Sequence, residues 1–226
     1  MLSVKHIFFD LDHTLWDFDK NSKLTFKQIF EEQQIDLNID VFLEVYMPIN
    51  FEYWRLYRED KIEKEALRYG RLKDTFDQLK FSATDDLIHQ ISHDYISYLP
   101  NYNYLIDGTI ELLEYLKPKY ELHIITNGFE EVQNLKLEES GIKKYFNEII
   151  TSEEVGVKKP NVKVFEYAFE RAACLAHESI MIGDSYEADV LGGINAGMLA
   201  VYFNPEKKEE NGVLSIAKLS QLKQYL

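Results

Sequence analysis

Hydrophobic residues follow two different spacings along this chain, and each spacing predicts a different kind of element. Short, nearly continuous apolar runs are typical of buried strands, and they occur at 4–10, 121–126, 148–151, 179–183 and 199–203. Segments with the three- and four-residue spacing of amphipathic helices follow at 108–116, 130–140, 162–173 and 187–196. Strands that alternate with helices predict a parallel sheet with right-handed crossovers.

The stretch from residue 18 to residue 100 has a different pattern. It contains no Val/Ile-rich run of the kind that forms strands, but apolar residues recur at helical spacing, as at Phe42, Val45 and Tyr46. This stretch is therefore predicted to form four or five helices, inserted after the first strand.

Together these patterns predict an α/β fold with a parallel-sheet, Rossmann-like core and an inserted all-helical domain. The core is expected to comprise residues 1–17 and 101–226, and the inserted domain residues 18–100. The segment 215–226 is expected to form one more helix, and 206–211 a solvated loop.

Polar residues follow four of the predicted strands at the point where each strand ends. Asp10 and Asp12 follow the first strand, 126–128 ends the second, Lys159 comes shortly after the third, and Asp184 follows the fourth. Ligands of open parallel sheets bind at the carboxyl ends of the strands. These residues are therefore expected to share one edge of the sheet.

Asp10 and Asp12 are the most informative pair among them. Residues two apart on an extended chain point the same way, so their carboxylates should repel each other unless a cation lies between them. Carboxylate oxygens are typical ligands of hard divalent cations, and a metal held between carboxylates is suited to handling phosphate. The pair therefore predicts a magnesium-assisted reaction of a phosphate compound.

Composition excludes several other classes of function. The chain of 226 residues has a formal net charge of −14, which argues against binding a nucleic acid polymer or an anionic membrane surface. Cys174 is its one cysteine, so no internal disulfide can form, as suits a reducing cytoplasm. No apolar run approaches the length of a transmembrane helix. We expect a cytoplasmic protein, monomeric or homodimeric, that binds a small phosphorylated metabolite.

Four segments, in this order, resemble the signature of the haloacid dehalogenase-like hydrolases. They are Asp10-Leu11-Asp12-His13-Thr14, then Thr126, then Lys159-Pro160, and finally Gly183-Asp184-Ser185-Tyr186-Glu187-Ala188-Asp189. The helical insertion looks like the helical cap of that family. Each motif alone is weak, but four in order, each behind a predicted strand, make a strong signal.

The resemblance implies a phosphoryl-transfer mechanism centred on the first motif. Asp10 would be the nucleophile that forms an aspartyl-phosphate, and Asp12 the general acid and then the base. Mg²⁺ would be held by Asp10, by the backbone carbonyl of Asp12 and by the carboxylate of Asp184. Thr14 and Asp189 would support this site. The cation is needed because two like charges about 4 Å apart repel by roughly 4 kcal/mol at an effective dielectric near 20.

The second and third motifs would bind the phosphate. By the same resemblance, Thr126 and the amides of Asn127 and Gly128 would hold phosphate oxygens, and Lys159 would neutralise charge on the nucleophile and on the phosphate. Thr126 and Lys159 would thereby belong to the catalytic set.

Asp12 and the inserted helices bear on the substrate. A halide leaving group needs no proton, whereas an alkoxide does, so the acid at Asp12 favours phosphate transfer over dehalogenation. The segments 53–58 and 67–71 look similar to the pyrimidine-nucleotide 5′-phosphatase branch of the family. Possible substrate contacts there are Tyr53, Trp54, Tyr57 and Arg71, although such aromatic residues more often pack in a helical core.

We therefore expect a pyrimidine-preferring nucleoside 5′-monophosphatase. A broad sugar-phosphate phosphatase, a phosphomutase that uses the same pair of acids, and a non-catalytic phosphate-binding module are the alternatives left open. The last of these predicts a broken catalytic set, which this chain does not have.

Overall fold

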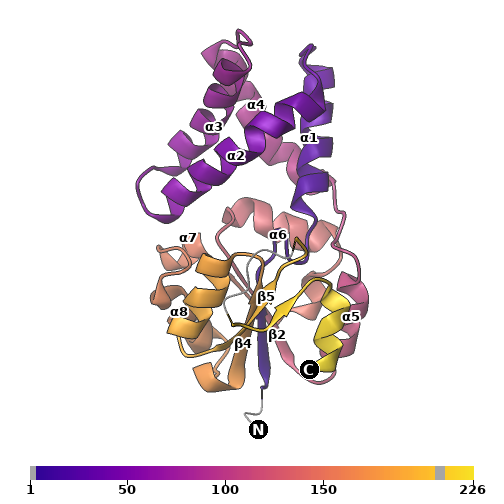
Figure 1. The fold of residues 1–226 in the computed structure, drawn as a ribbon, viewed down its shortest axis with the longest axis vertical. Coiled ribbons are helices and arrows are strands. Elements are labelled where there is room, and N and C mark those ends of the chain that lie inside the picture. The colour runs from indigo at the N-terminus through magenta and orange to yellow at the C-terminus, as the bar shows by residue number, and fades with distance from the viewer. Residues whose placement is uncertain (1–3, 207–211) are drawn as a thin grey trace. The chain divides into compact units, whose positions relative to one another are not determined.

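The computed structural model describes residues 4–206 and 212–226, and the chain forms two compact units (Figure 1). Unit 1 consists of Met1–Phe18 and Asn103–Leu226, and unit 2 of Asp19–Tyr102. The loop expected at 206–211 lies, except for its first residue, outside the described residues.

Unit 1 is built on a parallel six-stranded sheet, which confirms the predicted fold class. The strand order is β3-β2-β1-β4-β5-β6. The strands are β1 (His6–Phe9), β2 (Glu121–Thr126), β3 (Glu148–Thr151), β4 (Ser179–Gly183), β5 (Leu199–Phe203) and β6 (Ser215–Ile216). Because β1 lies between β2 and β4, the residues that follow these three strands come from neighbouring positions at one edge of the sheet.

The register of the central strands aligns their ends closely. Phe9 pairs with Ile124 of β2 and with Ile182 of β4, and the Asp10 amide donates to the Ile182 carbonyl at 2.9 Å. These apolar side chains are fully buried, as their unbroken hydrophobic runs predicted. Asp10 is therefore anchored at the edge of the sheet by a core that the sequence pattern specifies.

Helices of unit 1 connect the strands. They are α5 (Thr109–Leu116), α6 (Glu130–Glu139), α7 (Ser152–Val155), α8 (Val162–Arg171) and α9 (Gly192–Asn195), with 3₁₀ turns at η2 (Lys143–Tyr145) and η3 (Ala176–Glu178). A further 3₁₀ turn, η1 (Leu99–Asn101), belongs to unit 2. On one side of the sheet, Phe165 and Ala168 of α8 pack in a buried cluster with Phe8, Ile125 and Met181.

Two predicted helices of unit 1 are wrong in detail. The segment 187–196 is a π-helical turn, η4 (Tyr186–Leu191), followed by the short α9, and the π turn is marked by the Val190 amide donating to the Ser185 carbonyl at 3.3 Å. The segment 215–226 is not one helix but the short strand β6 and a 3₁₀ helix, η5 (Leu219–Gln224). The start of this segment pairs with the edge of β5 instead of continuing a helix. The Asn204 amide, directly after β5, donates to the Ile216 carbonyl at 2.7 Å.

Unit 2 contains four α-helices, in agreement with the four or five that the sequence predicted. They are α1 (Phe18–Glu32, which begins on the last residue of unit 1), α2 (Ile39–Arg58), α3 (Lys64–Gln78) and α4 (Asp85–Tyr98). Asn38 caps α2 by accepting from the amides of Asp40 and Val41, and Thr84 caps α4. Aromatic residues form the core of this unit, where Phe26 contacts Phe42 and Tyr46 edge to face.

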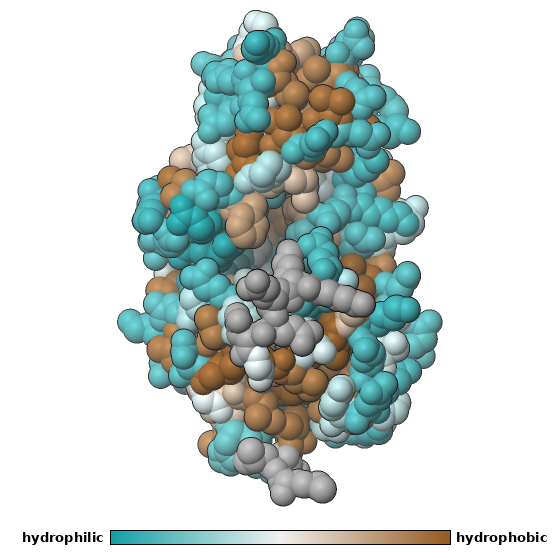
Figure 2. All heavy atoms as spheres, in the orientation of Figure 1, coloured by the Kyte–Doolittle hydropathy of each residue, from teal (hydrophilic) through white to brown (hydrophobic). Residues whose placement is uncertain are grey.

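Figure 2 shows hydrophobic surface interspersed with hydrophilic side chains on both units. In the part of the chain that the structure describes, no helix combines the length and the hydropathy that a membrane crossing requires.

Candidate active site

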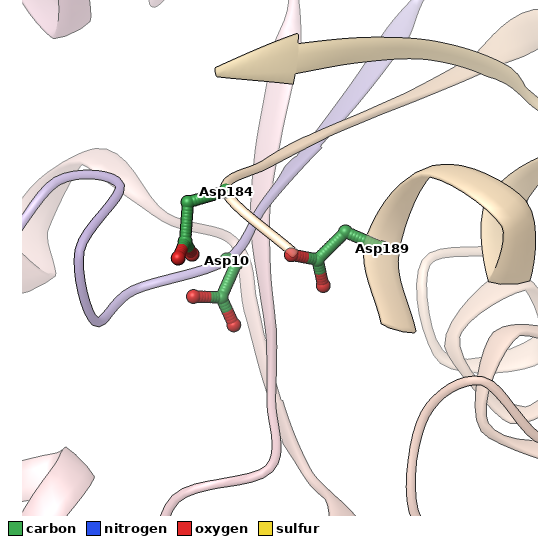
Figure 3. A group of neighbouring side chains, drawn as sticks. All are labelled: Asp10, Asp184 and Asp189. Carbon is green, nitrogen blue, oxygen red and sulfur yellow. The ribbon is translucent and has the colours of Figure 1, made fainter. Parts of the chain in front are cut away.

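Three carboxylates meet at the edge of the sheet in unit 1. Asp10 follows β1, Asp184 follows β4, and Asp189 comes from the π turn after β4 (Figure 3). One carboxylate oxygen from each lies within 4.8 Å of the others, and among the described residues these three form the one group of this kind. Oxygen donors at this spacing are what Mg²⁺ and Ca²⁺ prefer in proteins.

Lys159 is the cation of this cluster. Its Nζ lies 2.7 Å from Asp10 Oδ1 and 2.6 Å from Asp189 Oδ1, and it donates to the Ile125 carbonyl at 2.7 Å. The side chain is 1% exposed, so each of its three donors is satisfied inside the protein. One lysine thus joins the loop between α7 and α8 to the ends of β1 and β2.

The electrostatics of the cluster show an excess of negative charge. Burial raises the pKa of Asp10 well above its usual value, and Asp189 and Asp184 add to this effect while Lys159 opposes it. Burial and the neighbouring Asp189 raise the pKa of Asp184 to about 7. Burial alone would lower the pKa of Lys159, but Asp10 and Asp189 outweigh it, and its pKa is raised. A divalent cation would replace the proton that these carboxylates otherwise hold.

Backbone and hydroxyl groups orient two of the carboxylates. The Thr14 hydroxyl donates to Asp184 Oδ1 at 3.2 Å and accepts from the Asp184 amide at 3.1 Å. The Ser185 amide donates to Asp189 Oδ2 at 3.0 Å. A Cβ at Gly183 would lie 2.2 Å from Asp189 Oδ2, so only glycine allows Asp189 to fold back over the end of β4.

The loop after β2 presents a hydroxyl to the same edge. Thr126 Oγ1 accepts from the Gly128 amide at 3.1 Å and from Gln133 Nε2 at 2.7 Å. Since two donors occupy its lone pairs, its own hydrogen remains available for an acceptor. The Asn127 side chain, in contrast, makes two hydrogen bonds to the backbone of Lys159. Its Oδ1 accepts from the Lys159 amide at 2.8 Å, and its Nδ2 donates to the Lys159 carbonyl at 3.0 Å. Asn127 therefore fixes the lysine loop with its side chain.

The Asp12 carboxylate, two residues after Asp10, binds two side chains of α6. Lys136 Nζ lies 2.6 Å from Asp12 Oδ1, and Gln133 Nε2 donates to Asp12 Oδ2 at 2.9 Å. The Lys136 side chain is 2% exposed and lies over the ring of Trp16, 4.3 Å from its centroid. The Asp12 carboxylate thus has two donors from α6, whereas the ligand expected of Asp12 for a metal ion is its backbone carbonyl.

Lys136 and Gln133 were not identified from the sequence, because only the structure shows which face of α6 is buried. Val132, Gln133, Lys136 and Leu137 are the buried positions of α6, so half of its buried face is polar. On a face known to be buried, a polar pair three residues apart indicates a buried partner.

The four residues proposed as substrate contacts lie in unit 2 and have partners there. The Tyr53 hydroxyl donates to Asp74 at 2.7 Å, and the Trp54 and Tyr57 rings meet edge to face. Arg71 is 2% exposed, and its guanidinium donates to the Asn50 side chain at 2.8 Å.

Comparisons with known proteins agree with the four motifs. The family model "Haloacid dehalogenase-like hydrolase" matches residues 7–203. The chain is similar to "Pyrimidine 5'-nucleotidase YjjG" of Escherichia coli (strain K12), with 32% identity over 97% of this chain and 96% of that protein. It has the same percentage identity to "Glyceraldehyde 3-phosphate phosphatase" of Methanothermobacter thermautotrophicus, 32% over 99% of this chain and 100% of that protein.

A solved structure resembles the whole chain. The magnesium-bound "putative HAD-hydrolase YfnB" of Bacillus subtilis superimposes with a TM-score of 0.90 and 32% identity, and covers 99% of both chains. A family model that spans most of the chain, relatives at this identity and four motifs on adjacent strand ends lead to one conclusion: the chain belongs to the haloacid dehalogenase-like hydrolases.

Proposed function

We propose that this phosphatase hydrolyses nucleoside 5′-monophosphates, preferably those of pyrimidines, with Mg²⁺ and through an aspartyl-phosphate on Asp10. The observation that carries the proposal is the buried Asp10 carboxylate at the end of β1, paired with Lys159 and adjacent to Asp184. A carboxylate in that setting can be both a nucleophile and a metal ligand.

The chemistry of the donors fits a magnesium ion. Lys159 already neutralises part of the charge of Asp10 and Asp189, while Asp184 has a hydrogen bond from Thr14 and a raised pKa. Asp10, Asp184 and the backbone carbonyl of Asp12 would hold the ion. When bound, Mg²⁺ supplies positive charge that offsets the repulsion between the nucleophile and the phosphate.

The reaction then proceeds through this chain's own side chains. A carboxylate oxygen of Asp10 attacks phosphorus, the bond from phosphorus to the ester oxygen breaks, and the departing oxygen takes a proton from Asp12. In the second step Asp12 accepts a proton from water, and that water attacks phosphorus. The products are free Asp10 and inorganic phosphate.

Two groups would stabilise the phosphate during both steps. The Thr126 hydroxyl has its acceptor positions filled by Gly128 and Gln133, so it can donate to a phosphate oxygen. Lys159 is held in a water-excluded position, where a fixed positive charge interacts more strongly with developing negative charge than it would in water.

The pyrimidine preference has support from the relatives and from the sequence. One relative at 32% identity is named a pyrimidine 5'-nucleotidase, and segments 53–58 and 67–71 resemble that branch. Stacking on an aromatic side chain contributes roughly 1–3 kcal/mol per base. We therefore assign base recognition to unit 2, as the cap, with Tyr53, Trp54 and Tyr57 as contacts.

A sugar-phosphate phosphatase is the second candidate, because a glyceraldehyde 3-phosphate phosphatase is also 32% identical to this chain. A panel of phosphorylated metabolites distinguishes the two. We expect kcat/KM for UMP, dUMP and dTMP to exceed that for triose and hexose phosphates. Equal or faster turnover of the sugar phosphates would exclude the nucleotidase assignment.

The mechanism is tested separately, with p-nitrophenyl phosphate. Asp10→Asn should abolish phosphate release, and removal of Mg²⁺ with a chelator should do the same for the unaltered protein. Asp107→Asn, at an exposed aspartate of the same unit, is the matched control and should retain activity. Mass spectrometry of acid-quenched enzyme should find phosphate on Asp10. Full activity in Asp10→Asn would refute the nucleophile.

A further inference from the structure

We propose that Lys136 and Gln133 of α6 are positioning residues for Asp12, which they hold in the orientation required for proton transfer. The inference rests on the proposed function, because it concerns the residue assigned there as acid and base. It adds two residues outside the four motifs to the machinery of the reaction.

The geometry shows a carboxylate held at both of its oxygens. Asp12 Oδ1 is bound by Lys136 Nζ at 2.6 Å and Asp12 Oδ2 by Gln133 Nε2 at 2.9 Å. The two donors are three residues apart on α6, which places them on one face of the helix. Two contacts to different oxygens fix both the position and the rotation of the carboxylate.

Burial makes a purely packing role for Lys136 implausible on energetic grounds. Transfer of an ammonium ion out of water costs several kcal/mol, and an apolar residue would fill the same space without that cost. The lysine is 2% exposed, Asp12 is the acid that it pairs with, and Trp16 and Phe18 lie beside the ammonium with ring centroids at 4.3 and 5.3 Å. The ammonium group is thus held between two aromatic rings and the Asp12 carboxylate.

Gln133 connects the acid to the phosphate-binding loop. The same Nε2 that donates to Asp12 also donates to Thr126 Oγ1 at 2.7 Å. A Cβ at Gly128 would lie 2.3 Å from that nitrogen, so the glycine keeps room for the amide. One side chain therefore sets the distance between the proposed acid and the hydroxyl proposed to hold the phosphate.

A positioned acid matters only when the leaving group needs a proton. General acid–base catalysis contributes typically 10²- to 10⁴-fold and requires the acid to be within hydrogen-bond reach. Loss of orientation should therefore slow the expulsion of a basic alkoxide strongly and the expulsion of p-nitrophenolate weakly. A general structural defect would slow both equally.

The experiment measures kcat/KM for a series of aryl phosphates of rising leaving-group basicity, and for an alkyl phosphate, with Mg²⁺ present. The variants are Lys136→Met and Gln133→Leu, with Lys136→Arg as the conservative replacement. Lys143→Met is the matched control, since Lys143 is an exposed lysine that pairs with Glu138.

We expect Lys136→Met and Gln133→Leu to lose at least about tenfold more activity on the alkyl phosphate than on p-nitrophenyl phosphate. Lys136→Arg should recover part of the difference, and Lys143→Met should follow the unaltered protein. Equal losses on all substrates, or no loss, would overturn the positioning role.

Two further controls keep the result decisive. Thermal unfolding shows whether Lys136→Met still folds; if it does not, Gln133→Leu alone decides the question, because that change removes no charge. Inactivity of the unaltered protein on the entire series would overturn the proposed function itself, whereas an active enzyme whose variants lose rate uniformly would overturn only this inference.

Discussion

His123 provides a stability prediction whose magnitude follows directly from the structure. This histidine lies in β2, is 2% exposed, and stacks on Phe8 with ring centroids 4.6 Å apart. His6 also stacks with it, with Nδ1 3.2 Å from His123 Nε2. Burial, then His6 and Lys117, lower the pKa of His123 from 6.5 to about 3. The folded protein therefore keeps this imidazole neutral.

The sign of the pH effect follows from proton binding. Below pH 6.5 the unfolded chain gains a proton at His123, and the folded protein does not gain it until the pH is near 3. Stability is therefore lost as the pH falls through this window. Between pH 8 and pH 5 the loss is about 2 kcal/mol, at about 1.4 kcal/mol per pH unit below 6.5. Burial also lowers the pKa of His6, which Glu121 and Glu178 oppose and Lys5 reinforces, so His6 contributes in the same direction.

The perturbation is His123→Phe, which keeps an aromatic ring against Phe8 but cannot take up a proton. Urea unfolding from pH 8 to pH 5 measures the free energy of unfolding at each pH. The two tryptophans lie in different units, Trp16 in unit 1 and Trp54 in unit 2, so a Trp54→Phe background makes fluorescence report on unit 1.

His123→Phe should remove most of the stability loss that the parent shows at low pH. The difference in free energy of unfolding, variant minus parent, should therefore increase by about 2 kcal/mol as the pH is lowered from 8 to 5. His177→Phe, at an exposed histidine of the same unit, should retain the pH dependence of the parent. Parallel curves for His123→Phe and the parent would refute the reasoning, since they would mean that His123 binds its proton equally in both states.

Two other substitutions test the carboxylate cluster and the backbone beside it, and a third, just after α6, is a control for backbone strain. Lys159→Met should lower the rate of phosphate release at least about hundredfold, because it removes a fixed positive charge from the site; Lys158→Met is the neighbouring control, and equal rates in both variants would contradict the assignment. Gly183→Ala should destabilise unit 1 by about 1–3 kcal/mol in urea unfolding and reduce activity, because the new Cβ would meet Asp189 Oδ2 at 2.2 Å. Gly141→Ala should cost about 1–2 kcal/mol through its positive φ of 71° while kcat stays unchanged; a comparable loss of kcat in this variant would show that strain alone lowers activity.

Much of the fold was predictable because it is encoded locally. The hydrophobic runs of β1, β2 and β4 are buried on both faces, so they show in the sequence without reference to any partner. Parallel pairing then brings their carboxyl ends to one edge of the sheet. The positions of Asp10, Thr126 and Asp184 could be predicted because these residues lie at or directly after those ends. The four helices of unit 2 were predictable for the same reason, since their apolar faces repeat at helical spacing.

Other features depend on contacts that no local pattern records. The segment 215–226 has apolar residues suited to a helix, but the free edge of β5 draws Ser215 and Ile216 into the sheet. The π turn of η4 depends on Asp189 folding back onto the Ser185 amide. For 215–226 the competing partner, β5, lies outside the segment, so the periodicity within it cannot reveal the strand.

The sequence alone therefore determined the family, the parallel sheet and the residues that end its strands, because periodicity and four short motifs are written in consecutive positions. The tertiary structure alone decided that Lys136 and Gln133 hold Asp12, that Asn127 clamps the loop of Lys159, and that His6 meets His123. The two residues in each of these contacts are separated by 32 to 124 positions along the chain. Polar residues in a helix or strand look the same in sequence whether solvent or a buried partner satisfies them, and only the packed fold distinguishes the two.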